Sequence, residues 1–197
     1  LNKRRDLMQR KFTTKLILSM IIVLLLVILL KIFNIYDLIR KQFYRQEYSE
    51  YVNKYAEINE IDPAWIYAII KVESNFNKDA TSNSGARGLM QLMDLTAIEI
   101  AKELNLENFE INMLYEPEIN IMIGTKYFNK LLEKYNQNYY LAIAAYNGGI
   151  GNVDEWIKKG VINQDGSNIE NIPYKETNIY VRKTIKSYVV YVELYKV

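Results

Sequence analysis

The residue best placed for acid–base chemistry in this sequence is Glu73. It follows a helical stripe of Ile66, Ile69 and Ile70, at a position where a three- or four-residue period calls for another apolar side chain. Contact with isoleucine and closeness to a helix C-terminus both disfavour a charged carboxylate, so we expect a raised pKa for Glu73. A glutamic acid that stays protonated near neutral pH can donate a proton to the leaving oxygen of a glycosidic bond. The alternative, from the pattern alone, is a glutamate at a fraying helix end, turned to solvent.

The composition leaves few other residue types for catalysis. The 197 residues include no Cys and no His, which excludes disulfides, thiolate nucleophiles, Ser-His-Asp triads and metal sites built on sulfur or imidazole. Composition does not exclude calcium bound by oxygen ligands. The loop of residues 79–85 nevertheless fails as a calcium site, because its glycine comes one place late and Met90 occupies the twelfth position. We therefore predict no metal and no cofactor.

A polar loop with two glycines follows Glu73. Its first part is rich in Asn, Ser and Asp, and Gly85 and Gly88 come next. Glycine lets a backbone approach a ligand closely. Gln91 then stands among apolar residues, so its amide needs hydrogen-bond partners. The segment is typical of a loop that turns back towards the helix it follows.

Two later segments carry side chains that suit a sugar ligand. Tyr146 ends an Ala-rich helix just before Gly148 and Gly149, where a phenol can project into a cleft; it could equally be a core tyrosine. Glu176 and Tyr180 are four residues apart and share a helix face. Without further information, that pair could equally face solvent.

Taken together, these segments resemble a known family. The strings ESNFNKDATSNSGARGLMQLM, AAYNGGIGNV and IPYKETNIYV occur in the order typical of lytic transglycosylases of the soluble-Slt type, glycoside hydrolase family 23. The resemblance covers about residues 47–195. It implies an α-helical, lysozyme-like fold and the cleavage of bacterial peptidoglycan.

The resemblance also implies roles for individual residues. Glu73 would be the only catalytic acid and base. The residues expected to line the sugar cleft are Ser82, Gln91, Met93, Tyr146, Asn147, Glu176 and Tyr180. The expected reaction cleaves the β-1,4 bond between N-acetylmuramic acid and N-acetylglucosamine and leaves a 1,6-anhydromuramic acid end. The alternatives are a hydrolysing muramidase of the goose-lysozyme kind and a non-catalytic peptidoglycan-binding module of an envelope machine.

The elements that position these residues are predicted to be helices. Apolar residues recur at three- and four-residue spacing along most of the chain after residue 47. A proline stands at three places where a helix could begin: Pro63, Pro117 and Pro173. Asp94 is placed to cap a further helix. The segment 188–195 is the best candidate for a strand, but its continuity with the preceding helix favours a helix. We predict an all-α, lysozyme-like domain over residues 47–197.

The first residues of the chain predict a membrane anchor. Residues 1–15 contain six basic side chains and one acidic one, and residues 16–30 contain no charge. Extended to Tyr36, the apolar segment can span a bilayer if Lys31 directs its ammonium group to the interface. The residues after it are too large for a signal-peptide cleavage site, which favours an uncleaved anchor.

The charge distribution predicts the topology and the partners. A basic N-terminal end stays in the cytoplasm. We therefore predict a cytoplasmic tail at 1–15, a transmembrane helix at 16–36, a stalk at 37–46 and a catalytic domain at 47–197 on the outer, cell-wall side of a bacterial membrane. The body is mildly acidic, which argues against nucleic acid as a partner. Peptidoglycan strands and the membrane are the expected partners, and no feature identifies a protein partner in an envelope complex.

Overall fold

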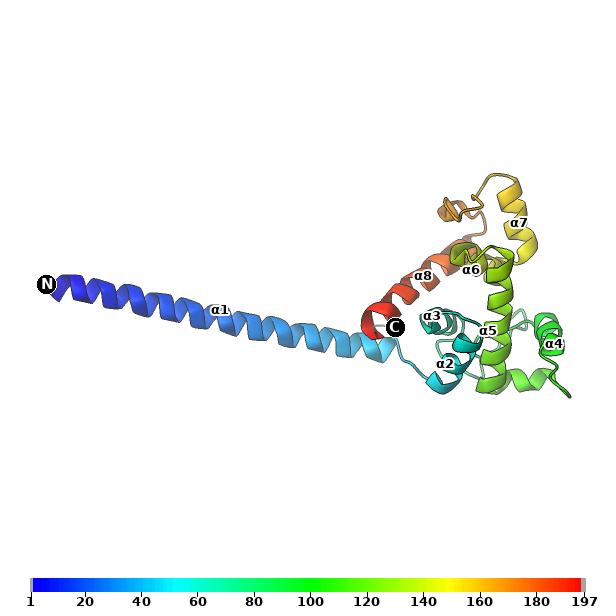
Figure 1. Cartoon of the computed structure of the whole chain (residues 1–197), viewed down its shortest axis with the longest axis horizontal. Helices are drawn as coiled ribbons and strands as arrows, with labels where there is room; N and C mark the ends of the chain where they lie inside the picture. Colours follow the sequence, from blue (N-terminus) through cyan, green and yellow to red (C-terminus); the bar gives the residue numbers. More distant parts are fainter. Residues whose placement is uncertain (1, 196–197) are drawn as a thin grey trace. The chain divides into compact units, whose positions relative to one another are not determined.

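The chain forms two compact units that divide between Arg45 and Gln46. The computed structural model describes residues 2–195, and the side chains of residues 15–32 and 35–195. The first unit consists of one helix, α1 (Asn2–Phe43), drawn in blue to cyan in Figure 1. This helix includes the segment predicted to span a membrane and continues into the predicted stalk.

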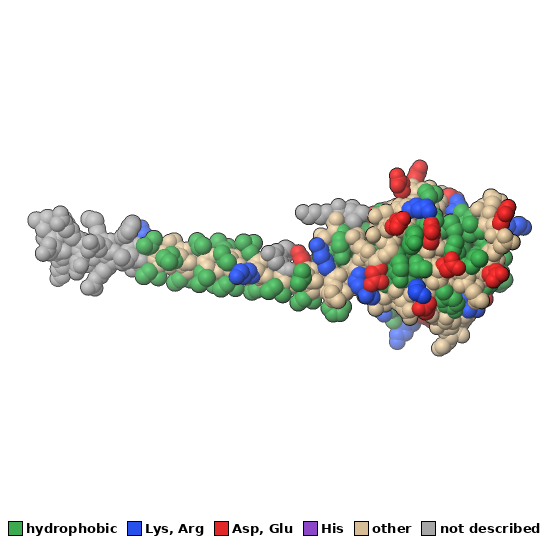
Figure 2. Space-filling view, turned by 90° about the horizontal axis from the view of Figure 1, so that it is seen from below, with side chains coloured by type: hydrophobic (Ala, Val, Ile, Leu, Met, Phe, Trp, Pro, Cys, Tyr) green, Lys and Arg blue, Asp and Glu red, His purple; other side chains and the backbone are tan. Residues whose placement is uncertain are grey.

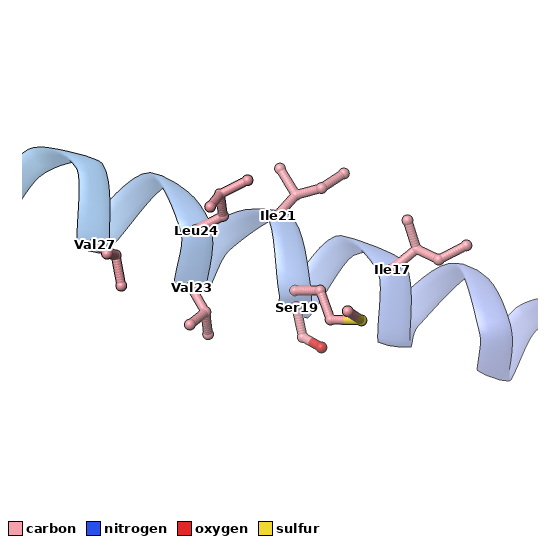
Figure 3. A pocket seen from close by; sticks show the side chains of 7 residues that line it. Ile17, Ser19, Ile21, Val23, Leu24 and Val27 are labelled. Atoms are coloured by element: carbon pink, nitrogen blue, oxygen red, sulfur yellow. The ribbon is translucent and has the colours of Figure 1, made fainter.

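Residues 16–30 of helix α1 expose apolar side chains on all sides. Ile17, Ile21 and Leu24 project from one side of the helix and Ser19 and Val23 from another (Figure 3). The Ser19 hydroxyl donates to the carbonyl oxygen of Leu16 (2.7 Å) and therefore needs no partner outside the helix. In Figure 2 hydrophobic side chains cover most of the described surface of α1, whereas the visible face of the second unit mixes acidic, basic and apolar groups. By length and composition, residues 15–43 could cross a membrane.

The second unit is built from helices (Figure 1). Its α-helices are α2 (Ser49–Ile58), α3 (Pro63–Glu73), α4 (Asp94–Glu103), α5 (Pro117–Lys134), α6 (Tyr139–Gly148), α7 (Ile150–Lys158) and α8 (Lys175–Tyr195). Two 3-10 helices, η1 (Ile111–Tyr115) and η2 (Ile169–Asn171), join them. Within residues 2–195 no sheet forms, and segment 188–195 belongs to α8. The prediction of an all-α fold is confirmed.

Two of the three predicted helix starts are correct. Helix α3 begins at Pro63 and α5 at Pro117. Helix α8 begins at Lys175, two residues after Pro173. The amide of Asn178 donates to the carbonyl oxygen of Tyr174 (2.9 Å), so the helical hydrogen bonds start only after the proline.

The prediction that Asp94 caps a helix is wrong. Met93 occupies the N-cap of α4, and Asp94 is the first residue of the helix. The Asp94 carboxylate instead pairs with the guanidinium group of Arg87 (2.9 Å), which lowers the pKa of Asp94. The carboxylate therefore ties the start of α4 to the loop that precedes it.

Helix α3 lies in the centre of the second unit and packs most extensively against α8. Its residues from Ala64 to Ile70 are all buried. At its N-terminus, the Trp65 ring stacks on Tyr188 of α8 (3.8 Å between centroids) and on Tyr139 of α6 (4.9 Å). The Tyr188 hydroxyl also donates to Asp62 (3.0 Å), whose other oxygen caps α3. These contacts fix the N-terminus of α3 against the C-terminal half of α8.

The contact between Trp65 and Tyr188 determines which residues of α8 lie opposite Glu73. Helices α3 and α8 run antiparallel, since Trp65 meets Tyr188 while Glu73 interacts with Tyr180. Eight residues separate the two members on each helix, and each stretch rises by about 12 Å. The end of α3 is therefore held in register with the first half of α8, more than 100 residues later in the chain.

Candidate active site

A cleft of about 570 Å³ opens beside the C-terminal end of α3. Its walls come from the end of α3, the end of α6 and the first half of α8. The residues that line it are Val72, Glu73, Asn147, Lys175, Glu176, Ile179, Tyr180 and Lys183. Four residues predicted from the sequence are thus brought together: Glu73, Asn147, Glu176 and Tyr180.

The Glu73 carboxyl group is partly buried in this cleft. The pKa of Glu73 is raised from 4.5 to about 7. Desolvation is the main cause, and the nearby negative charge of Glu176 contributes to the same rise. The hydroxyl of Tyr180 acts in the opposite direction, because it is near enough to favour the carboxylate. It does not reach the geometry of an ordinary hydrogen bond, so this buried hydroxyl has no partner among the described residues. The expected rise in the pKa of Glu73 is confirmed, with desolvation as its main cause.

Tyr146 lies next to Glu73 but uses its hydroxyl elsewhere. The phenol donates to the carbonyl oxygen of Met90 (2.8 Å), and its ring packs against Tyr127 and Phe128. Burial raises the pKa of Tyr146 well above its usual value, and the charge of Glu73 contributes. Tyr146 therefore ties the loop between α3 and α4 to the end of α6. It is not among the residues that line the cleft, so its contact with a sugar stays a prediction.

The side chain of Gln91 forms hydrogen bonds to the backbone of the same loop. Its Nε2 donates to the carbonyl oxygens of Ala80 (3.1 Å) and Gly88 (2.9 Å), which confirms that this amide needs partners inside the protein. Its backbone is in the left-handed region, with φ of 48°. That conformation is uncommon for a residue other than glycine, and the two side-chain hydrogen bonds stabilise it.

Ser82 lies within the loop between α3 and α4, and Met93 is the last residue of the loop before α4. The Ser82 hydroxyl accepts from the amide of Ala86 (2.9 Å) and closes a turn. The Met93 side chain is 47% exposed. Ser82, Gln91 and Met93 are not among the residues that line the cleft, so their contact with a sugar stays a prediction.

Asn120 of α5 also holds the loop and was not among the predicted residues. It is fully buried. Its Oδ1 accepts from the amide of Met90 (2.8 Å), and its Nδ2 donates to the carbonyl oxygens of Arg87 (3.0 Å) and Leu114 (2.8 Å). The only sequence signal was an amide next to Ile121, since a buried amide must be paired. Asn120 and Tyr146 together hold both backbone polar groups of Met90.

Gly88 and Ser74 complete the attachment of the loop. Gly88 has a φ of 72°, and a Cβ atom there would overlap the carbonyl oxygen of Leu114 and the Asn120 side chain. Only glycine allows this close approach. The Ser74 hydroxyl, directly after Glu73, donates to the carbonyl oxygen of Leu89 (2.8 Å). The loop is thus joined to the end of α3 beside the acid.

The cleft offers a protonatable acid, a second carboxylate, a phenol, an amide and two ammonium groups. Over the described side chains, no three acidic groups are arranged to hold a metal ion. The groups present can bind polar ligands and move a proton. An all-helical body whose central helix ends on such an acid, in an open cleft, has the features of a lysozyme-like protein.

Comparison with known families defines the class further. Residues 50–168 match the family model described as the transglycosylase SLT domain. This match covers more than half of the chain, so the protein belongs to the transglycosylase SLT family.

Two named relatives illustrate the range of the family. The chain is 34% identical over 140 residues to the soluble lytic murein transglycosylase of Salmonella typhimurium, a match that covers 70% of this chain and 22% of that protein. It is 37% identical over 102 residues to the membrane-bound lytic murein transglycosylase C of Photorhabdus laumondii, covering 47% and 29%. The chain therefore spans less than a third of the length of these relatives.

Solved structures agree with the fold. An inactive mutant of the lytic transglycosylase Slt of Pseudomonas aeruginosa, with one glutamate replaced by glutamine, superposes with a TM-score of 0.71 at 34% identity. That match covers 76% of this chain and 24% of the other. The 70 kDa soluble lytic transglycosylase of Escherichia coli also gives a TM-score of 0.71, at 29% identity, over 78% of this chain and 25% of that one. The resemblance to the soluble-Slt type and the lysozyme-like fold are confirmed.

Proposed function

We propose that this protein is a peptidoglycan lytic transglycosylase with Glu73 as its only catalytic acid and base. The observation that carries the proposal is the carboxyl group of Glu73, which lies at the wall of a sugar-sized cleft with a pKa near 7. Such an acid is about half protonated at neutral pH and can act in both directions. The names of the relatives, and the inactive Glu-to-Gln mutant of the Pseudomonas aeruginosa enzyme, support this activity.

In the first step, protonated Glu73 donates its proton to the oxygen that links N-acetylmuramic acid to N-acetylglucosamine. The bond between this oxygen and the anomeric carbon breaks, and the N-acetylglucosamine side leaves with a new hydroxyl. The acetamido group of the muramic residue supports the positive charge that develops on the anomeric carbon. Tyr180 and Asn147 line the same cleft, and in this proposal they orient the sugar.

In the second step, the Glu73 carboxylate takes the proton of the muramic 6-hydroxyl. The oxygen of that hydroxyl forms a bond to the anomeric carbon, which closes the 1,6-anhydro ring. Glu73 is again protonated, so the cycle is complete. No water is consumed, and one carboxyl group is sufficient for both proton transfers.

One observation favours hydrolysis as the second candidate. Glu176 lines the same cleft and interacts electrostatically with Glu73. Glycosidases that hydrolyse often use a second carboxylate to activate water or to stabilise the sugar cation. Glu176 is exposed at the start of α8, which suits substrate binding better than activation of an enclosed water.

Digestion of peptidoglycan in water labelled with heavy oxygen distinguishes the two reactions. With the full chain in detergent, we expect anhydromuramic ends without label, detected by mass spectrometry of the released fragments. Labelled reducing muramic ends would instead establish a hydrolase. Retained binding to peptidoglycan with no released fragments would establish a non-catalytic module.

We also propose that the protein is anchored in a bacterial membrane. Residues 1–15 would be cytoplasmic, 16–36 would span the bilayer, 37–46 would form a stalk, and 47–197 would act on the cell-wall side. The exposed apolar side chains of residues 16–30 support a lipid environment, and the basic residues before them support the orientation.

The absence of cysteine in the sequence permits a clean test of this topology. We expect a single cysteine in place of the exposed Lys158 to react with a membrane-impermeant maleimide on intact, wall-stripped cells. A single cysteine in place of Asn2 should react only after the cells are lysed. The reverse pattern would contradict the orientation, and release of both labelled proteins by high salt would contradict the anchor.

A further inference from the structure

Two lysines lie on the α8 wall of the cleft. Lys175, Ile179 and Lys183 follow one another at four-residue intervals and therefore form a row along one face of the helix. The two lysines are eight residues apart, which corresponds to about 12 Å along the helix axis. Both side chains are exposed. The row runs beside Glu176 and Tyr180, which occupy the neighbouring positions.

Neither lysine has an ion-pair partner among the residues that the structure describes. Elsewhere on the second unit, several lysines are paired: Lys54 with Glu118 (2.7 Å), Lys134 with Asp154 (3.0 Å) and Lys159 with Glu155 (2.5 Å). Within the described side chains, no carboxylate, the adjacent Glu176 included, forms an ion pair with the ammonium group of Lys175 or Lys183. They are therefore free to meet negative charge on a ligand in the cleft.

The charge of the cleft follows from its lining. When Glu73 carries its proton, the charged side chains are two lysines and one glutamate. The cleft then has a positive excess at the moment when the acid is ready to donate. A neutral glycan would not need that excess, whereas a glycan with carboxylate substituents would be drawn to it.

We propose that Lys175 and Lys183 bind the carboxylate groups that the glycan carries on its muramic residues. This inference rests on the proposed function and specifies its substrate class: peptidoglycan with free, ionised carboxylates. The shared chemistry is a carboxylate, supplied either by the lactyl group of a strand without peptide or by a stem peptide. Each lysine contributes one partly exposed ion pair. Amidation of the carboxylates removes that partner and weakens binding.

Equilibrium binding tests the proposal without depending on turnover. The full chain in detergent carries Glu73→Gln, so that the ligand is not consumed. Four soluble glycan fragments serve as probes: strands without peptide and strands with stem peptides, each with free or with amidated carboxylates. Lys175→Gln, Lys183→Gln and the double variant are compared with Lys186→Gln, which alters an exposed lysine of α8 that does not line the cleft.

We expect each cleft substitution to raise the Kd for fragments with free carboxylates by about threefold to fivefold, a size typical of exposed ion pairs. The double variant should raise this Kd by about tenfold, whereas arginine at both positions should restore binding. Lys186→Gln should have no effect, and amidated fragments should bind all variants equally. If the variants bind strands without peptide more weakly, the lactyl group supplies the carboxylate. If they bind only strands with stem peptides more weakly, the stem peptide supplies it.

Two results would overturn the proposal. One is an unchanged Kd in the double variant for every fragment with free carboxylates. The other is an equal loss for free and amidated fragments, which would indicate a structural effect of the substitutions. Failure of the proposed function appears separately, as absence of cleavage by the unmodified protein.

Discussion

We expect Glu73→Gln to lower the rate of glycan cleavage by about a thousandfold or more, within the range for loss of a general acid that also serves as base. Glutamine fills almost the same volume but has no acidic proton to donate. Of the other residues that line the cleft, only Glu176 carries a carboxyl group, and it lies exposed at the first turn of α8. Initial rates of fragment release from peptidoglycan measure the effect. Glu107→Gln, at an exposed loop position, is the matched control and should keep the parent rate.

The pH profile links this loss to proton donation. The cleavage rate of the parent should fall as the pH rises through about 7, because the folded-state pKa of Glu73 lies there and the carboxylate cannot donate. The residual rate of the glutamine variant should lack this decline. A decline of equal size in both proteins would assign the titration to another group. Retention of more than a tenth of the parent rate by Glu73→Gln would remove Glu73 from the proposed role.

Unfolding measurements separate catalysis from folding in this variant. A raised pKa means that the folded protein holds the proton more tightly than the unfolded chain. The protonated Glu73 side chain therefore contributes to the free energy of unfolding. This contribution is full below pH 4.5 and is lost as the pH rises through about 7. The shift corresponds to at most roughly 3 kcal/mol. The stability of Glu73→Gln relative to the parent should therefore increase as the pH rises from 4.5 to 8. If the variant is as stable as the parent or more stable, unfolding cannot explain its loss of activity.

The second large effect is expected at Asn120, which holds the loop beside the acid. Asn120→Leu keeps a similar volume but leaves two buried backbone groups without partners, the amide of Met90 and the carbonyl oxygen of Leu114. It also removes one of the two hydrogen bonds to the carbonyl oxygen of Arg87, which keeps the amide of Leu92 (3.0 Å). Each such group costs about 1–3 kcal/mol, so we expect a loss of about 3–5 kcal/mol in the free energy of unfolding. For a domain of this size, the Tm should fall by roughly 10 °C or more.

Asn129→Leu is the matched control on the same helix. Asn129 makes only an exposed side-chain hydrogen bond to Glu133 (3.1 Å), so its loss should change the Tm by no more than about 2 °C. Thermal unfolding followed by near-ultraviolet circular dichroism compares the two. Similar Tm values for Asn120→Leu and Asn129→Leu would show that the buried hydrogen bonds add little. We also expect Asn120→Leu to lower cleavage at temperatures where it is folded, because Met90 is then held by Tyr146 alone.

Local chemistry explains which features could be predicted. The helices follow from three- and four-residue apolar spacing, and α3 and α5 begin at proline because its fixed φ suits the first turn. The raised pKa of Glu73 was predictable because the residue continues the apolar stripe of its own helix, and burial is the main cause of the shift. The need of Gln91 for partners was predictable because its apolar neighbours are adjacent in sequence. Asp94 was misjudged because its partner, Arg87, competes with the helix terminus for the same carboxylate.

The sequence by itself therefore determined the helical class, the apolar N-terminal helix and the acid at the end of α3. Only the tertiary structure placed Glu176 and Tyr180 against that acid, through the pairing of Trp65 with Tyr188 at the other end of two antiparallel helices. It alone assigned Asn120 and Tyr146 to the loop, and Lys175 and Lys183 to the cleft. The reason is physical: helical periodicity fixes which face a side chain occupies, but the partner on the opposite face depends on how distant segments pack.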